Sequence, residues 1–417
     1  MYKKKLLTNF SSLYLFLILL TIGIKFPINN YFSSFSVLII LLAFFHHVIY
    51  FSLINKKFNS KLLKYNISFS LIIILYTTAA ILYKKLAYPS YPFIILFFQW
   101  TFFLLASNLN FDKIKKTFIS FIILNFGFYL IQVIGALIGS ENLLKLEFML
   151  AEKSGVEFIS IFPRASGIIT EPSHLSYIIL PIIIMSLYNF KDYYFKSYIK
   201  KFLLLFYFFT FSIISYFQLF LVYVVYSLRK FSIFKLLKFS LIVIVLVLFF
   251  INFDVFFNRI NGINNVVAGD DTKESSVLSI QSNLLVMMES LKIHPLFGGG
   301  LTSHRITYDQ FIGSLFPQFT EGGLLGLNQN DAGSLYILLL SEFGIVGFLC
   351  FMFFMIKCIL RFYKQLERNI IPFSFAITLL LLSFRYGNIA SFYILFYLQV
   401  VFMGLAFDNS FIEEQNA

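Results

Sequence analysis

One group of polar residues stands at the start of an apolar run and could carry out acid–base chemistry. Arg164 precedes Glu171 by seven positions, and Pro172, Ser173 and His174 follow directly. A carboxylate in this position could accept a proton from a hydroxyl group, while the arginine could bind an anion through two parallel hydrogen bonds. The alternative is structural, because Pro172 suits the first turn of a helix and an Arg164–Glu171 ion pair could simply hold a loop.

A second group of candidate residues lies in one long segment, residues 256–332. Arg259 comes near its start, while His304 and Arg305 follow a glycine triplet at 298–300 that could turn tightly or approach a ligand closely. His304 is the second candidate for the base, after Glu171. The candidate ligands for a diphosphate or glycan are Arg164, Arg259, Arg305, Arg385 and His174, because guanidinium groups bind phosphates in a bidentate manner. A solvated loop could carry the same residues without any function.

The composition excludes several classes of protein. Of the 417 residues, 59% are hydrophobic and only 13% are charged, and the mean hydropathy is +0.83. Soluble domains carry roughly 25% charged residues, so this chain cannot cover a soluble surface of its size. A soluble enzyme, a disordered chain and a disulfide scaffold are excluded. The two cysteines form neither a disulfide framework nor a metal cluster, and no metal site is predicted.

The elements that must position the polar groups are membrane helices. Apolar runs of spanning length are expected near 10–28, 33–54, 67–83, 91–107, 117–139, 174–190, 237–255, 333–356, 370–384 and 389–407. Residues 202–228 have basic flanks on both sides and predict a tight helical hairpin or a re-entrant pair that turns near Ser212–Ser215. The sequence therefore predicts one all-α polytopic membrane domain over 1–417, with about 12 spans (11–13).

The basic residues orient these spans in the membrane. Most of the 33 Lys and Arg residues cluster in alternate connections, from Lys3–Lys5 to Lys357–Arg368. By the positive-inside rule these connections face the cytoplasm, as do both termini, in a protein of the cell membrane. The charge of +13 thus reports topology and lipid contact rather than a nucleic-acid surface. Two connections, 140–173 and 256–332, are then expected outside, the second just before the last three spans.

The large outer loop contains a predicted amphipathic helix at 275–292. Its apolar positions recur with helical spacing and predict a stripe that packs against the membrane domain or lies in the lipid interface. The stripe consists of Val277, Ile280, Leu284, Met288 and Leu291. Beyond the loop, Glu342 lies inside an apolar span, where a carboxylate is expensive unless it faces partners.

Taken in order, the polar elements resemble motifs of the bacterial O-antigen polymerase and ligase superfamily. The matching segments are Arg164–Ser173, similar to R-x-x-G-x-x-x-E-P-S/N, His294–Gly300, similar to P-L-x-G-x-G, and Ser334–Gly347. The resemblance implies transfer of a glycan from a polyprenyl diphosphate donor to a sugar hydroxyl at the outer face, without a metal or other cofactor. The expected partners are the polyprenyl-diphosphate-linked glycan and membrane lipid, and a chain-length regulator is a candidate partner.

The resemblance favours a polymerase of O-antigen, capsule or exopolysaccharide over two alternatives. Ligases of the superfamily typically carry a His-Asn pair where this chain has Gly333-Ser334. The family often has an arginine early in the loop helix, where this chain has Gln281. A transporter or flippase for a lipid-linked solute would place its charges near mid-membrane. Here the informative charges are expected on one outer face, which favours an extracytoplasmic active site.

Overall fold

The structure is a computed structural model that describes most of the chain. The described residues are 2–22, 24, 35–54, 58–146, 158–159, 162–169, 171–188, 197–210, 212–229, 275–315, 326 and 328–408. The predicted span at 237–255 and the candidate ligand Arg259 lie outside these residues.

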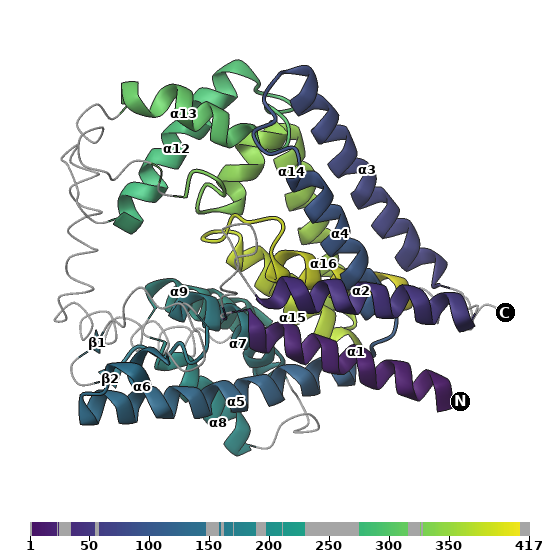
Figure 1. Cartoon of the computed structure of the whole chain (residues 1–417), viewed down its shortest axis with the longest axis vertical. Helices are drawn as coiled ribbons and strands as arrows, with labels where there is room; N and C mark the ends of the chain where they lie inside the picture. The colour runs from purple at the N-terminus through teal and green to yellow at the C-terminus, as the bar shows by residue number, and fades with distance from the viewer. Residues whose placement is uncertain are drawn as a thin grey trace.

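Helices make up almost all of the described chain (Figure 1). The first half contains α1 (Tyr2–Thr21), α2 (Phe35–Ile54), α3 (Ser60–Leu82), α4 (Tyr91–Ala106), α5 (Phe111–Ile138) and α6 (Glu141–Lys145). The strands β1 (Phe158–Ile159) and β2 (Phe162–Pro163) pair antiparallel. The second half contains α7 (Pro172–Leu187), α8 (Ser197–Phe208), α9 (Ile213–Arg229), α12 (Ser275–Ile293), α13 (Ser303–Leu315), α14 (Leu335–Lys364), α15 (Leu366–Leu382) and α16 (Phe392–Asp408).

The helical class is confirmed, but the predicted number of spans is not. Within the described residues four helices are long and apolar enough to cross a membrane, at Phe35–Ser52, Ser60–Leu82, Phe111–Ile138 and Leu335–Lys364. Shorter apolar helices occupy most of the other predicted positions, at Leu7–Thr21, Tyr91–Ala106, Pro172–Leu187, Ile214–Val225 and Phe392–Phe407. The helices are thus where the apolar runs predicted them, and about 12 full spans remains a prediction.

The predicted break inside 202–228 is confirmed. Helix α8 ends at Phe208 and α9 begins at Ile213, so the turn lies at or just before the expected Ser212. The turn is closed by two tyrosine hydroxyls. Tyr207 donates to the carbonyl of Ser215 over 3.0 Å, and Tyr216 donates to the carbonyl of Phe208 over 2.6 Å. Both helices pack against α7.

Buried amide side chains join three of the membrane helices. Asn66 of α3 and Gln399 of α16 exchange hydrogen bonds through their side-chain amides, at 3.1 Å and 2.5 Å. Gln99 of α4 donates to the backbone carbonyl of Asn66 over 2.8 Å. In an apolar surrounding an unpaired amide is costly, so these groups specify which helices meet.

Helix α14 is interrupted at Gly344, which has φ 67° and ψ −173°. The interruption separates two amides, Ile345 and Val346, from the carbonyls four residues earlier, Ser341 and Glu342. The chain at 295–300 supplies the missing partners. Ile345 and Val346 donate to the carbonyls of Pro295 and Leu296 at 3.0 Å each, while Gly299 and Gly300 donate to those of Ser341 and Glu342 at 3.2 and 2.9 Å. The glycine triplet thus approaches helix backbone.

The predicted outer connections meet at one end of the helices. Tyr88, after α3, donates to Asn330 before α14 over 3.1 Å, and Tyr91 donates to Asn388 between α15 and α16 over 3.1 Å. Figure 1 shows α12 and α13 gathered beside the upper end of α14. This arrangement agrees with the predicted alternation of loops. Which end faces the cytoplasm remains a prediction from the basic residues.

The predicted amphipathic helix is present as α12, and three residues of its apolar stripe are exposed. Ile280, Leu284 and Met288 are 38%, 42% and 50% exposed. The buried face instead carries small polar side chains beside Val286, among them Ser279, Ser282, Asn283 and Ser290. Leu291, at the end of the stripe, packs against the hydrophobic core, so the stripe divides between the two expected settings. Contact with the lipid interface stays a prediction.

Candidate functional site

The segment 164–169 is a buried loop that two amides of α5 hold in place. The Asn125 carboxamide oxygen accepts the Ile168 amide at 2.9 Å, and its nitrogen donates to the Ser166 carbonyl at 3.2 Å. Gln132 accepts the Gly167 amide at 3.0 Å. Gly167 has φ +56°, and a Cβ atom there would collide with the Asn125 side chain. The glycine of the motif is therefore required by close packing on α5.

Replacing Asn125 with leucine should destabilise this loop. Two backbone groups, at Ser166 and Ile168, would lose their buried partner, and each unpaired group costs about 1–3 kcal/mol. We expect a lower thermal unfolding temperature in detergent and weaker activity. Asn142→Leu is a matched control, because Asn142 is exposed on α6. Equal unfolding temperatures for the two variants would contradict this account of the loop.

Arg164 lies at the start of this loop and is only 6% exposed. Its Nε donates to the carbonyl of Thr210 over 3.3 Å, and the neighbouring Ala165 amide donates to the carbonyl of Phe209 over 2.8 Å. The arginine thus joins the buried loop to the turn between α8 and α9. Glu171 contacts other residues on the far side of the loop, so the structure places the two ends of the motif in different surroundings.

Glu171 is the N-cap residue of α7, with Pro172 in the first turn as the sequence predicted. Its side chain is 65% exposed. The Ser173 hydroxyl donates to one carboxylate oxygen over 3.0 Å, and Nε2 of His174 lies 4.0 Å from the same oxygen. Glu171 is therefore available to a molecule that approaches from solution.

An aromatic wall adjoins Glu171. The His174 ring lies edge-on to Tyr386, with ring centroids 5.2 Å apart, and Tyr386 in turn lies 5.4 Å from Tyr393 and 5.9 Å from Tyr177. These rings come from α7, from the connection after α15 and from α16. Tyr177 and Tyr393 are only 1% and 3% exposed, so the partly exposed rings of His174 and Tyr386 are the ones that a sugar ring or a lipid chain could contact. His174 is placed within this wall.

Arg385 brings a positive charge to the same place. It is half-buried, its Nη1 donates to the Gly333 carbonyl over 3.4 Å, and its charge acts on both His174 and Asp331. Asp331 accepts the Gly333 amide over 3.0 Å. Burial raises the pKa of Asp331, and the Gly333 amide and the Arg385 guanidinium oppose that rise. The structure thus brings Glu171, His174 and Arg385 together, as the sequence could not show.

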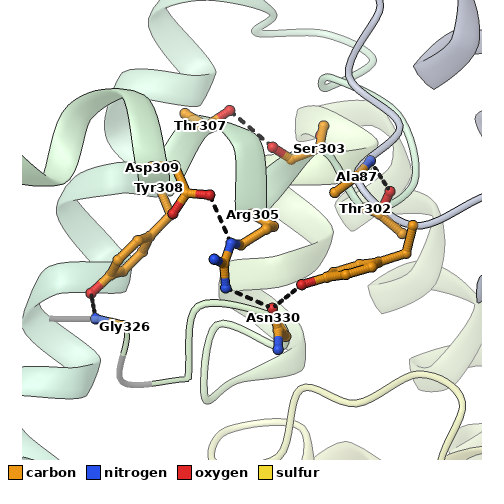
Figure 2. A network of polar contacts seen from close by, with 10 residues as sticks. Ala87, Thr302, Ser303, Arg305, Thr307, Tyr308, Asp309, Gly326 and Asn330 are labelled. Carbon is orange, nitrogen blue, oxygen red and sulfur yellow. Dashed lines mark hydrogen bonds and ion pairs between the residues drawn. The ribbon is translucent and has the colours of Figure 1, made fainter. Parts of the chain in front are cut away.

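Arg305 lies in a second polar network, on α13 (Figure 2). Its Nε donates to Asp309 over 2.8 Å, and its Nη1 donates to the Asn330 carboxamide oxygen over 3.2 Å. Tyr88 donates to the same Asn330 oxygen. Asn330 neighbours Asp331, so one short loop, 328–334, contacts both Arg305 and Arg385. The two networks therefore share a common support.

His304 is fully buried beneath this network. Its Nδ1 lies 3.0 Å from the Ser341 hydroxyl of α14, and its Nε2 lies 2.8 Å from the Asn283 carboxamide oxygen of α12. Burial lowers the pKa of His304 to about 3, so the ring is neutral at pH 7. With both nitrogens engaged and no exposure, the ring joins three helices. Its predicted part as a base stays a prediction, and this geometry favours Glu171.

The stability of the protein should fall on acidification partly because of His304. The unfolded chain binds a proton at the ordinary histidine pKa of about 6.5, whereas the folded chain does so only near a pKa of about 3. The His304 contribution is thus complete above pH 6.5 and is lost as the pH falls toward 3, by up to about 1.4 kcal/mol per pH unit. Unfolding temperatures from about pH 7.5 down to pH 4.5 should fall less steeply for His304→Gln. Parallel curves would refute this.

Glu342, the carboxylate inside an apolar span, faces the start of α13. It is 2% exposed, and the backbone amides of Thr302 and His304 donate to its carboxylate. These contacts tie Glu342 to the first turn of α13, the helix that carries His304 and Arg305. The sequence analysis expected Glu342 to face polar partners, and these partners are backbone amides.

Several residues of the site escaped the sequence analysis. Asn125, Asn283 and Asn66 could have been noticed in the sequence, since each is an amide side chain inside a helix that is otherwise apolar or periodic. No sequence feature marks Asp331 and Tyr386 as part of the site, because only the fold brings their loops together. Within the described residues, no three His, Cys, Asp or Glu side chains converge as metal ligands. Transfer without a metal stays a prediction.

Comparison with known protein families gives a match to part of the chain. Residues 202–352 match the family described as O-antigen ligase, a stretch that includes the α8–α9 turn, the glycine triplet and Glu342. A search among curated proteins returns no match. The family points to a glycan transferase of the O-antigen polymerase or ligase type, and the apolar helices indicate a multi-pass membrane protein. Residues 202–352 are therefore similar to the O-antigen ligase family, and this match supports the resemblance of the chain to the O-antigen polymerase and ligase superfamily.

Proposed function

We propose that the protein is a polysaccharide polymerase that transfers a glycan from a polyprenyl diphosphate donor to a sugar hydroxyl of a second lipid-linked repeat unit. The reaction takes place at the outer face of the cell membrane. The observation that carries the proposal is the exposed Glu171 carboxylate beside the Arg385 guanidinium and a tyrosine wall, at the end of the helices where the predicted outer loops meet.

Glu171 is the proposed base. As the acceptor oxygen bonds to the anomeric carbon, the bond from that carbon to the diphosphate oxygen breaks, and the acceptor proton passes to the carboxylate. Glu171 is better placed for this than His304, because 65% of its side chain is exposed and His304 is fully buried. Proton transfer to a positioned base contributes about 10²–10⁴-fold to such rates.

The leaving group departs as a lipid diphosphate and gains negative charge. Arg385 is the first proposed ligand, since it is half-buried beside Glu171, and Arg305 is the second, since loop 328–334 connects the two. Arg259 remains a further candidate. Arg164 is a weaker one, because its guanidinium is buried at the α8–α9 turn. Fixed cations in a partly dry site stabilise developing charge without reorganisation.

The polymerase is favoured over a ligase by the positions where ligases typically carry His-Asn. Here Gly333 has φ +61° and its carbonyl accepts from Arg385, while the Ser334 hydroxyl donates to the Ser383 carbonyl over 3.1 Å. Both residues are buried, and neither offers a titratable side chain. The base must then come from elsewhere in the site, and Glu171 is the exposed carboxylate beside it.

A polymerisation assay tests the proposal. The purified protein is incubated with a synthetic polyprenyl-diphosphate oligosaccharide, and the products are resolved on a gel. A polymerase yields a ladder with spacing of one repeat unit. Transfer of one glycan to a different lipid acceptor, without a ladder, would indicate a ligase. Unchanged substrate that nevertheless binds, and crosses the bilayer of proteoliposomes, would overturn the proposal in favour of a transporter.

A further inference from the structure

A row of basic residues follows one side of α14 at the end opposite the proposed site. Lys357, Arg361 and Lys364 are spaced by four and three positions, so they lie along one face of the helix. Phe353, Ile356 and Leu360 occupy the same face between and before them. We call these six residues the α14 stripe.

The α14 stripe points away from the protein core. The residues on the other side of this part of the helix, Met355, Cys358 and Phe362, are at most 2% exposed. Phe353, Ile356 and Leu360 are instead 69%, 47% and 57% exposed. In a membrane helix, the face turned away from the core contacts lipid. The stripe therefore presents both apolar and cationic groups to the bilayer.

The stripe also lines a surface cavity of about 630 Å³, together with Gln365. The Lys357 ammonium lies 6.0 Å from the centre of the Phe353 ring, so it turns back over the apolar part of the cavity. Among the described residues no carboxylate forms an ion pair with Lys357 or Lys364. Positive charge thus collects around a hollow whose walls are otherwise apolar.

The position of the cations along α14 matches the lipid phosphates. A helix crosses the hydrocarbon core in about 20 residues, and counted from Leu335 this distance ends close to Phe353. Lys357 lies about 6 Å further along the helix, at 1.5 Å per residue, and the long side chains of Arg361 and Lys364, about 12 and 16 Å along, can extend back toward the same depth. Phe353 and Ile356 then lie at the edge of the acyl chains, and the three cations can reach the headgroups.

We propose that the α14 stripe is a binding site for one anionic phospholipid of the cytoplasmic leaflet. The phosphate is held by Lys357, Arg361 and Lys364, and an acyl chain lies against Phe353 and Ile356. A free anion would use the cations but not the exposed apolar wall. Scattered interfacial lysines, which only orient a span, would not surround a cavity.

Native mass spectrometry of the full-length protein tests the site. The protein in detergent is mixed with phosphatidylglycerol or with phosphatidylcholine of the same chain length, and bound lipids are counted. We expect one phosphatidylglycerol to be retained in preference to phosphatidylcholine. The triple variant Lys357→Gln/Arg361→Gln/Lys364→Gln should bind it at least about 10-fold more weakly, since each cation near the surface adds to the attraction.

A matched triple variant on α5 provides the control. Lys113→Gln/Lys115→Gln/Lys116→Gln removes the same number of charges from the same predicted membrane face, and none of these three lysines lines the cavity beside the α14 stripe. Its lipid binding should equal that of the wild type. Equal losses in both variants, equal retention of the two lipids by the wild type, or full competition by inorganic phosphate would each overturn the proposal. The wild-type comparison remains decisive even where a variant folds poorly.

Discussion

Glu171→Gln should reduce the rate of glycan transfer by about 10²–10⁴-fold, because glutamine cannot accept the proton of the acceptor hydroxyl. The substitution keeps the size of the side chain and an oxygen that can accept from the Ser173 hydroxyl, which lies 3.0 Å from the carboxylate. Since 65% of the side chain is exposed, the fold should be unaffected. The ladder assay measures the rate, and the thermal unfolding temperature reports the fold.

The control for this variant is Glu141→Gln. Glu141 is an exposed glutamate of the same predicted outer connection, 140–173, and it pairs with Lys145 one turn away. It should polymerise at the wild-type rate. Donor binding by Glu171→Gln should remain close to normal, because a base acts in the transition state. A Glu171→Gln rate within about threefold of the wild type would remove Glu171 from the mechanism and leave the proton acceptor to be sought among other groups.

Gly344→Ala should unfold the outer part of the protein. The backbone at Gly344, with φ 67° and ψ −173°, lies in a region that is open almost only to glycine, and a side chain there costs about 1–3 kcal/mol in strain. A Cβ atom would also lie only 2.5 Å from the Leu296 carbonyl carbon and the Gly298 nitrogen. The loop 295–300 would be displaced, and with it α13 and Arg305.

We expect Gly344→Ala to lower the unfolding temperature strongly and to abolish the ladder. Gly313→Ala is the matched control, because a Cβ atom on this α13 glycine would meet nothing within 4 Å. Alanine there should be neutral or should stabilise the helix by up to about 1 kcal/mol. A Gly344→Ala protein that unfolds like the wild type would show that the interruption of α14 does not depend on glycine.

The apolar runs predicted the helices well. The pattern of α12 predicted its start at Ser275 and its end within a residue of Ile293, and the basic flanks of 202–228 predicted the break before α9. Such features are local, since spacing and flanking charges are read within one helix. The polar residues on the buried face of α12 were not predicted, because Asn283 and Ser279 face the protein through hydrogen bonds that periodicity cannot express.

The residues of the site were predicted in part. Glu171, His174 and Arg385 were singled out as separate candidates on two elements far apart in the chain, and only the fold shows that they share one surface. Arg164 was expected beside Glu171 from its position in the motif. The structure buries it against Thr210 instead, because the intervening loop folds onto Asn125 and Gln132.

The sequence by itself determined that this chain belongs in a membrane, where its helices run and which of its polar residues lack a topological reason. These properties depend on hydropathy and spacing, which each segment carries alone. The tertiary structure decided which of those polar residues meet, which are exposed and which are buried. That decision depends on contacts between segments far apart in the chain, such as loop 295–300 on α14 and Arg385 on loop 328–334. The roles of the glycine triplet and of Arg385 follow only from the segments that the fold places in contact with them.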